Sequence, residues 1–288
     1  MGWIANEDTI IFYPYYNEEL DIQLISAYKK LIFSDYDFYE ETFNEKTFDK
    51  KIFEAYINYD LIFFEFMGSN FNQDISNLAH GLTHLIFGND FNQNVLNLPS
   101  SLIYLTFGNM FNQNVSALPP FLTHLFFSEQ FNQDVSNLPS SLTHLTFGTC
   151  FNQDISKLPQ TLTHLSLGYE FNKEYDIPSN IKYLMLNCNN SHIINSLPNS
   201  VTELEFGQEF NLEINNLPTS IKKLVIIKSS CFNNDLNCLP DFIEELHLNC
   251  EYTKRTLKIP PNLKKIICYK NYPYKDDFVK IYDVQTYK

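Results

Sequence analysis

Histidines recur at a fixed interval along the middle of the chain, and imidazole is the side chain best suited to metal binding and proton exchange near neutral pH. His124, His144 and His164 follow one another every 20 residues, and His84 and Tyr104 extend the same spacing upstream. The same place in later segments is taken by Tyr183, Glu203, Lys223, Glu245 and Lys265. Imidazoles about 5 Å apart on neighbouring strands can titrate together or share a metal ion. Because a flat row of side chains does not converge on one point, we expect no metal site and no cofactor.

A second column holds acidic and amide side chains, which bind calcium when they converge in a tight turn. Its members are Asp74, Asn94, Asn114, Asp134 and Asp154. The glycine-rich nonapeptide of calcium-binding β-rolls is absent from the sequence. We therefore interpret this column as solvated turn residues.

Signatures of catalysis are missing from the sequence. It contains no GxSxG, no phosphate-binding glycine loop, no HExxH and no dinucleotide fingerprint. The six cysteines form neither a CxxC pair nor a zinc-binding pattern with histidine. We predict a protein that is not an enzyme. With no secretory signal and no apolar run of 18 residues, we expect reduced thiols, no membrane span and a cytoplasmic location.

The charge of the chain argues against an anionic partner. The formal net charge is −14, and Arg255 is the single arginine. Residues 181–288 are nearly neutral, with 12 acidic and 13 basic side chains, so the negative charge lies in residues 1–180. Such a surface repels phosphate, and we therefore expect neither nucleic acid nor an acidic membrane as a partner.

The columns exist because the chain repeats itself. One unit, which begins at Leu142, reads LTHLTFGTCFNQDISKLPQT. A Phe-Asn pair begins at Phe71 and returns every 20 residues up to Phe171, and a proline marks each unit from Pro99 to Pro260 at spacings of 19 to 22. Ten strand lines follow, from Leu82-Leu85-Phe87 to Leu263-Ile266-Cys268. A period of about 20 residues is typical of a solenoid.

Each unit predicts one coil of that solenoid. The L-x-x-L-x-F segment reads as a short strand whose third position points outward, and we expect the glycine after it, such as Gly108 or Gly168, to turn the chain with a positive φ. Twenty residues leave little room for an α-helix. Six large side chains point inward in each coil, as in Leu142, Leu145, Phe147, Phe151, Ile155 and Leu158. We predict an all-β-dominated repeat solenoid, a leucine-rich-repeat-like parallel β-stack of about ten coils of about 20 residues.

A column of asparagines follows the phenylalanine of each unit. Repeated asparagines inside a stack can bond the backbone of their own coil and of the next one. We assign this structural ladder to Asn72, Asn92, Asn112, Asn132, Asn152 and Asn172.

The two ends depart from the unit, as solenoid caps do. We predict a mixed α/β amino-terminal cap over residues 1–60, the solenoid over 61–268 and a carboxy-terminal cap, with a closing strand or loop, over 269–288. Residues 18–31 have apolar side chains at helical spacing and predict a capping helix. Leu31-Ile32-Phe33 and Leu61-Ile62-Phe63 echo the strand motif and suggest degenerate coils.

The unit FNQ[DN][VI]xxLPxxLTHLxFG closely resembles the FNIP repeat, a leucine-rich-repeat-like family found in social amoebae and in giant viruses of amoebae. The resemblance covers about residues 68–268 and implies a non-enzymatic module that binds a protein through its exposed β-face, with a host protein as one candidate. Some viral members carry an amino-terminal F-box, which leaves a ubiquitin-ligase adaptor as an alternative, although residues 1–60 lack a clear Leu-Pro start of an F-box. A structural role in a virion is a further alternative, and the oligomeric state stays open.

Overall fold

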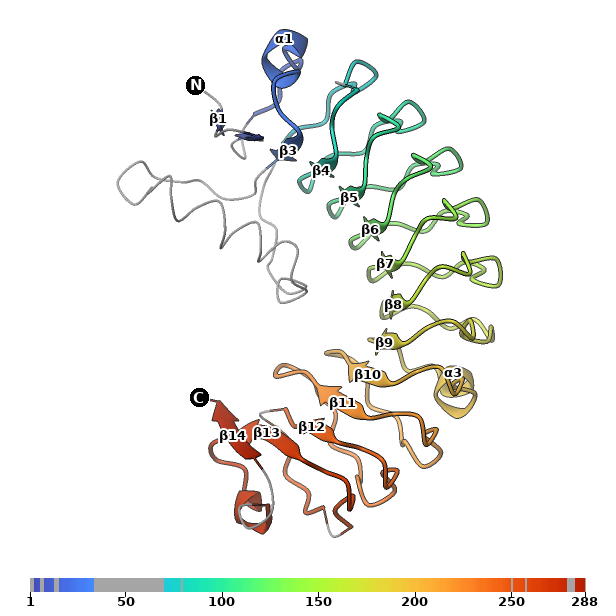
Figure 1. The fold of residues 1–288 in the computed structure, drawn as a ribbon, viewed down its shortest axis with the longest axis vertical. Coiled ribbons are helices and arrows are strands. Elements are labelled where there is room, and N and C mark those ends of the chain that lie inside the picture. Colours follow the sequence, from blue (N-terminus) through green and yellow to red (C-terminus); the bar gives the residue numbers. More distant parts are fainter. Residues whose placement is uncertain are drawn as a thin grey trace. The chain divides into compact units, whose positions relative to one another are not determined.

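The structure is a computed structural model that describes residues 3–5, 8–12, 16–33, 70–78, 80–249, 251–256, 258–278 and 283–287. The chain forms two compact units, Met1–Phe131 and Asn132–Lys288, and each is a stack of short strands linked by turns (Figure 1). The strand-like triplet Leu61-Ile62-Phe63 and the part of the expected cap from 34 to 60 lie outside the described residues.

The first unit is a parallel stack that begins upstream of residue 61. Its strands are β1 (Trp3–Ala5), β2 (Thr9–Phe12), β3 (Lys30–Phe33), β4 (His84–Ile86), β5 (Tyr104–Thr106) and β6 (His124–Phe126). β1 runs antiparallel to β2, and every later neighbour is parallel. Leu31, Leu85, Leu105 and Leu125 are paired in register, so equivalent side chains of successive coils meet.

The second unit continues the same pattern. Its strands are β7 (His144–Thr146), β8 (His164–Leu167), β9 (Tyr183–Leu186), β10 (Glu203–Phe206), β11 (Lys223–Ile226), β12 (Glu245–His247), β13 (Lys265–Tyr269) and β14 (Asp283–Tyr287). All neighbours are parallel and in register. The ten predicted strand lines are β4 to β13, which confirms the repeat solenoid, while the tail contributes the extra strand β14.

The core is a set of columns that run along each stack. The six inward side chains predicted for the coil at Leu142 are all buried, from Leu142 to Leu158. Phenylalanines add a column of stacked rings: Phe87 and Phe91 lie 3.7 Å apart within one coil, and Phe91 lies 6.2 Å from both Phe71 and Phe111. Each buried side chain of this kind contributes about 1.5–3 kcal/mol, and only stacking can bury it.

Glycine follows the strand for a different reason from the one that we expected. No positive φ occurs at Gly108, Gly168 or Gly207. Instead, a Cβ on Gly108 would lie 2.2 Å from the carbonyl oxygen of Gly88, and a Cβ on Gly168 would lie 1.8 Å from that of Gly148. The expectation of positive φ was wrong at these positions, because it is the close approach of the preceding coil that excludes a side chain.

We expect Gly168→Ala to lower the free energy of unfolding by about 1–3 kcal/mol, because the added methyl must displace backbone of the neighbouring coil. Gly81→Ala is the matched control, since nothing lies within 4 Å of its Cβ. Urea unfolding followed by circular dichroism measures both variants. Equal stability of the two variants would contradict the close-approach explanation.

The proline of each repeat begins a turn that leads into the next strand. The carbonyl oxygen of Pro99 accepts a hydrogen bond from the N–H of Leu102 at 3.2 Å, and Pro159 does the same with Leu162 at 3.1 Å. This i to i+3 bond fixes the direction in which each strand begins.

The first unit contains a coil whose halves are distant in sequence. Phe33 stacks on Phe71 at 3.9 Å, as Phe87 stacks on Phe91. Residues 34–70 separate Phe33 from Phe71, whereas only 88–90 separate Phe87 from Phe91. One coil upstream, Phe12 and Tyr16 occupy the equivalent places, with ring centroids 4.5 Å apart and planes tilted by 43°. The coils therefore begin at β2.

Helices are few and short among the described residues. α1 (Ile22–Ile25) is shorter than the helix predicted for 18–31, because the backbone of Lys29 and Lys30 already bonds the carbonyl of Asp8 at the start of β3. α3 (Ser191–Asn195) is capped by Asn190, and η2 (Lys275–Asp277) is a 3₁₀ turn.

Candidate interaction face

Aromatic side chains form a row on the outward-facing side of the strands. We call it the ring row: it comprises His84, Tyr104 and His124 in the first unit, and His144, His164 and Tyr183 in the second. These six residues open β4 to β9. Within each unit the strand register places them side by side, as the sequence spacing predicts.

The rings of this row stack on one another. His84 and Tyr104 lie 5.6 Å apart between ring centroids, and Tyr104 and His124 lie 5.2 Å apart. In the second unit His144 and His164 approach to 4.0 Å, and Tyr183 follows at 5.6 Å. Each unit thus has a short series of stacked aromatic rings on its outward face.

Threonines orient the imidazoles. The hydroxyl oxygen of Thr163 shares a hydrogen bond with Nδ1 of His164 at 2.9 Å and donates toward the carbonyl oxygen of Thr143, 3.2 Å away. The same pairing joins Thr83 to His84, Thr123 to His124 and Thr143 to His144. The hydroxyl groups of Thr83, Thr123 and Thr163 also donate to a carbonyl oxygen of the preceding coil, which fixes the orientation of the neighbouring imidazoles.

Burial is uneven along the ring row. The histidines are half-buried, but only 4% of Tyr104 is exposed, because it lies among His84, His124 and Phe126. Tyr104 therefore lies on the outward side of its strand but is covered by its neighbours.

Burial favours the neutral form of two histidines of the ring row, His84 and His164. Burial, helped by the charge of Lys30, lowers the pKa of His84 to about 4, against the opposing effect of Asp8. Burial also lowers the pKa of His164, although Glu203 opposes the change. Near neutral pH these two rings present an uncharged surface.

We expect stability to fall as the pH is lowered from about 6.5 towards 4, and His84→Gln to reduce that fall. In this window an unfolded histidine, with a pKa near 6.5, binds a proton that folded His84 does not, so acid favours the unfolded state. Urea unfolding at pH 7 and pH 5 measures the difference. His80→Gln, on an exposed turn, is the control, and equal pH dependence of both variants would refute the role of His84.

The row continues as charged side chains in the later strands. Glu203, Lys223, Glu245 and Lys265 take the place of the rings in β10 to β13 and pair with one another in register. Lys30 and Asp283 occupy the same place in β3 and β14. The sequence comparison of units missed these last two, because their coils lack the Phe-Asn motif or its spacing.

The asparagine column forms hydrogen bonds from coil to coil. Oδ1 of Asn72 accepts from the backbone N–H of Asn92 at 2.9 Å, and Oδ1 of Asn92 accepts from Asn112 at 2.9 Å. In the second unit Asn132 accepts from Asn152, and Asn152 from Asn172. In three of these rungs the next residue is a glutamine that donates to the same oxygen: Gln93 to Asn72, Gln113 to Asn92 and Gln153 to Asn132.

The ladder extends beyond the six asparagines that the spacing identified. Asn17 accepts from the backbone N–H of Asn72 at 3.0 Å, and Asn211 accepts from Asn233 at 3.4 Å. A phenylalanine or tyrosine precedes each of these asparagines, with a second phenylalanine four residues earlier in Phe12-x-x-x-Tyr16-Asn17 and Phe206-x-x-x-Phe210-Asn211. This shorter motif is the signal that would have found them.

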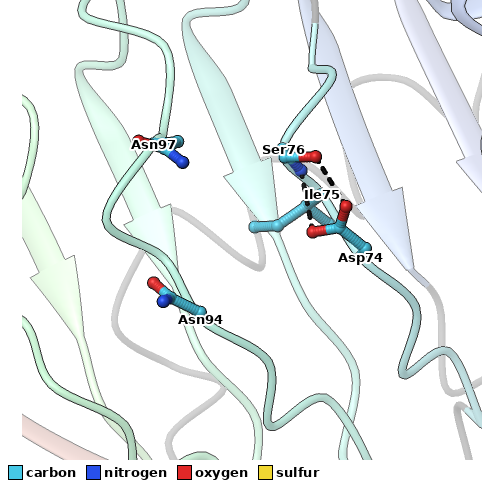
Figure 2. Close-up of a pocket in the computed structure, with 5 residues that line it drawn as sticks. All are labelled: Asp74, Ile75, Ser76, Asn94 and Asn97. Carbon is cyan, nitrogen blue, oxygen red and sulfur yellow. Dashed lines mark hydrogen bonds between the residues drawn. The ribbon is translucent and has the colours of Figure 1, made fainter.

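The second column of the sequence closes turns. Oδ1 of each member accepts from the backbone N–H two residues further on, at 2.7–3.2 Å, for Asp74, Asn94, Asn114, Asp134 and Asp154. Figure 2 shows a shallow pocket where Asp74 and Ser76 lie opposite Asn94 and Asn97. The hydroxyl of Ser76 donates to Asp74 at 2.5 Å, and these bonds lower the pKa of that carboxyl group. The carboxylate is thus already engaged within its own turn.

The described residues contain neither a metal-binding cluster nor a membrane-spanning helix. They contain no group of three or more His, Cys, Asp or Glu side chains placed to hold a metal ion. Within the same residues, no helix has the length and apolar character that crossing a membrane requires.

The fold and its outward face define a leucine-rich-repeat-like (LRR-like) repeat solenoid, a class whose members are typically non-enzymatic interaction scaffolds. The family model described as FNIP Repeat matches residues 71–110, 91–130, 111–150, 131–170, 151–189, 171–209 and 189–229. These matches together span more than half of the chain, which therefore belongs to the FNIP repeat family, as the motif predicted.

One solved structure, CroV588, supports the fold. CroV588, from a giant virus and described as a novel circular LRR protein structure, is 26% identical with a TM-score of 0.54 and is matched over 94% of this chain. The chain spans only 51% of the length of CroV588. YopM from Yersinia enterocolitica WA-314 is 17% identical over 70% of this chain and 63% of its own, with a TM-score of 0.31. A search of curated proteins finds no match.

Proposed function

We propose that this protein is a protein-binding module whose contact surface is the outward strand face around the ring row. The observation that carries the proposal is the stacking of half-buried, oriented rings at successive strands, with His144 and His164 only 4.0 Å apart. LRR-like folds generally bind proteins, which supports the same function.

The chemistry of the ring row suits a protein surface better than an ionic ligand. His84 and His164 are uncharged near neutral pH, and threonines fix their rings. Oriented rings lose little conformational entropy on binding, and aromatic side chains are enriched in protein interfaces. Thr106 and Thr146, at the fifth strand position, add hydroxyl groups beside the rings and are partly exposed. The partner that fits is a neutral protein segment with apolar and hydrogen-bonding groups.

The proposal is tested by comparing what two variants of the full chain capture. The face variant carries His124→Ala, His144→Ala and His164→Ala. The control variant carries Asp134→Asn and Asp154→Asn, on exposed turns away from the strands. Quantitative mass spectrometry after capture from amoebal lysate should show proteins that the wild type and the control retain equally and that the face variant loses by about tenfold, as the loss of about 1.4 kcal/mol would cause.

Thermal melts of all three proteins must first show that the face variant is folded. If the folded face variant retains every protein that the wild type retains, the ring row is not the contact surface.

A further inference from the structure

Charged side chains on the outward face change sign from each strand to the next in β10 to β14. At the third strand position Glu203 is followed by Lys223, Glu245, Lys265 and Asp283. The residue before it repeats the charge in three of these strands, as Lys222, Glu244 and Lys264. At the second and third strand positions, successive coils therefore present one negative, two positive, two negative, two positive and one negative side chain.

The charged side chains of one coil, which we call a charged row, form ion pairs with those of the neighbouring coils. Nζ of Lys223 lies 3.4 Å from a carboxylate oxygen of Glu203, and Nζ of Lys265 lies 2.9 Å from Glu245. Glu244 is held from both sides, by Lys264 through a hydrogen bond and by Lys222 at 3.9 Å. The hydrogen bond and charge of Lys264 lower the pKa of Glu244. The carboxylates of all three glutamates are thus bonded to a lysine of an adjacent coil.

These ion pairs are not what holds the coils together. They are partly exposed, from 26% for the side chain of Glu245 to 72% for that of Lys264, and exposed ion pairs add little to stability. Burial of the inward column, which includes Leu204, Leu224 and Leu246, supplies the attraction between coils.

Burial of the inward column, however, does not discriminate between one coil and another. Each of these coils offers a leucine, an isoleucine or, in β14, Val284 at the same place, so a coil that stacked out of order would still bury its apolar face. The charged rows do differ between neighbours. Because adjacent strands lie about 4.8 Å apart, any arrangement that skips one coil sets like charges side by side.

We infer that the alternating charges of β10 to β14 fix the order of the coils in this part of the solenoid. Repulsion between like charges in a wrong arrangement exceeds the stabilisation that the ion pairs give to the correct one. We therefore expect removal of one coil, which brings like charges together, to destabilise this segment more than removal of two successive coils, which preserves the alternation. This inference concerns assembly of the fold and does not depend on the proposed function.

Three variants separate repulsion from the simple loss of ion pairs. K222Q/K223Q removes the charge of one coil, and K222E/K223E reverses it, so that five negative side chains in three adjacent coils have no positive side chain between them. The third variant inverts every row, with E203K, K222E, K223E, E244K, E245K, K264E, K265E and D283K. We expect the melting temperature to fall by about 2 °C or less on neutralisation and by at least about 5 °C on reversal, and full inversion to recover more than half of that loss.

Salt provides a second readout that does not require equal stability. At 1 M NaCl the screening length is about 3 Å, so the reversed variant should gain stability relative to the neutral one. Two deletions give the same comparison for coil order. Removal of residues 222–243 takes out one coil and places Glu244 and Glu245 beside Glu203, so that like charges meet. Removal of 222–263 takes out two coils and places Lys264 and Lys265 beside Glu203, so that opposite charges meet.

We expect salt to stabilise the single-coil deletion relative to the two-coil deletion. The inference is overturned if reversal costs no more than neutralisation, if full inversion fails to recover stability, or if both deletions respond to salt alike.

Discussion

Phe91→Ala should lower the free energy of unfolding by about 3–5 kcal/mol, the largest effect that we expect from a single change in this protein. Phe91 is fully buried and stacks on Phe87, Phe71 and Phe111, so it belongs to its own coil and to both neighbours. Truncation leaves a cavity between three coils whose backbones are already in hydrogen-bonded register and cannot collapse into it. Since whole domains are stable by about 5–15 kcal/mol, the loss is a large share of the total.

Phe121→Ala is a matched control in the same unit. The chemical change is identical, but 68% of Phe121 is exposed, and surface substitutions usually change stability by about 0.5 kcal/mol or less. Urea unfolding followed by circular dichroism measures both. Similar losses in the two variants would show that the phenylalanine column does not carry the stack.

The regular coils could be predicted because they repeat the same solution to one packing problem. Inward leucines every 20 residues, such as Leu145 and Leu165, cannot be buried unless equivalent positions meet in register. That condition alone places the third-position side chains in one row, and so it located the candidate face as well as the fold.

The first coils were harder to predict, because their pattern is divided. Leu31-Ile32-Phe33 has the strand pattern, but its Phe-Asn partner, Phe71-Asn72, comes after residues 34–70. No periodicity argument joins segments across such a gap, whereas the 3.9 Å ring contact does. At the other end β14 contains Asp283-Val284-Gln285-Thr286, which lacks the leucines that mark a strand line.

Interactions between coils were the other feature that the sequence did not predict. The close approach that demands Gly168 and the burial of Tyr104 depend on atoms of the preceding or following coil. A sequence read one unit at a time shows which residues occupy each column. It does not show the distance between neighbours, which decides whether a column is packed, paired or open.

Asn92→Ala should lower the free energy of unfolding by about 2–4 kcal/mol. Oδ1 of Asn92 accepts from the backbone N–H of Asn112 at 2.9 Å and from Nε2 of Gln113 at 3.0 Å. Alanine removes the acceptor of both donors at a part-buried place between coils, and each unsatisfied group costs about 1–3 kcal/mol. The N–H of Asn92 itself still bonds to Asn72, so the loss is confined to one rung.

Two further variants decide whether the acceptor oxygen is the cause. Asn92→Asp keeps an oxygen for both donors and should retain most of the stability near neutral pH. Asn94→Ala, two residues away, removes only a bond to Leu96 within an exposed turn, where water can replace it, and should cost less than about 1 kcal/mol. Chemical denaturation ranks the three variants. If Asn92→Asp is as unstable as Asn92→Ala, the ladder depends on the amide group and not on the acceptor, and the hydrogen bonds assigned to this column would have to be revised.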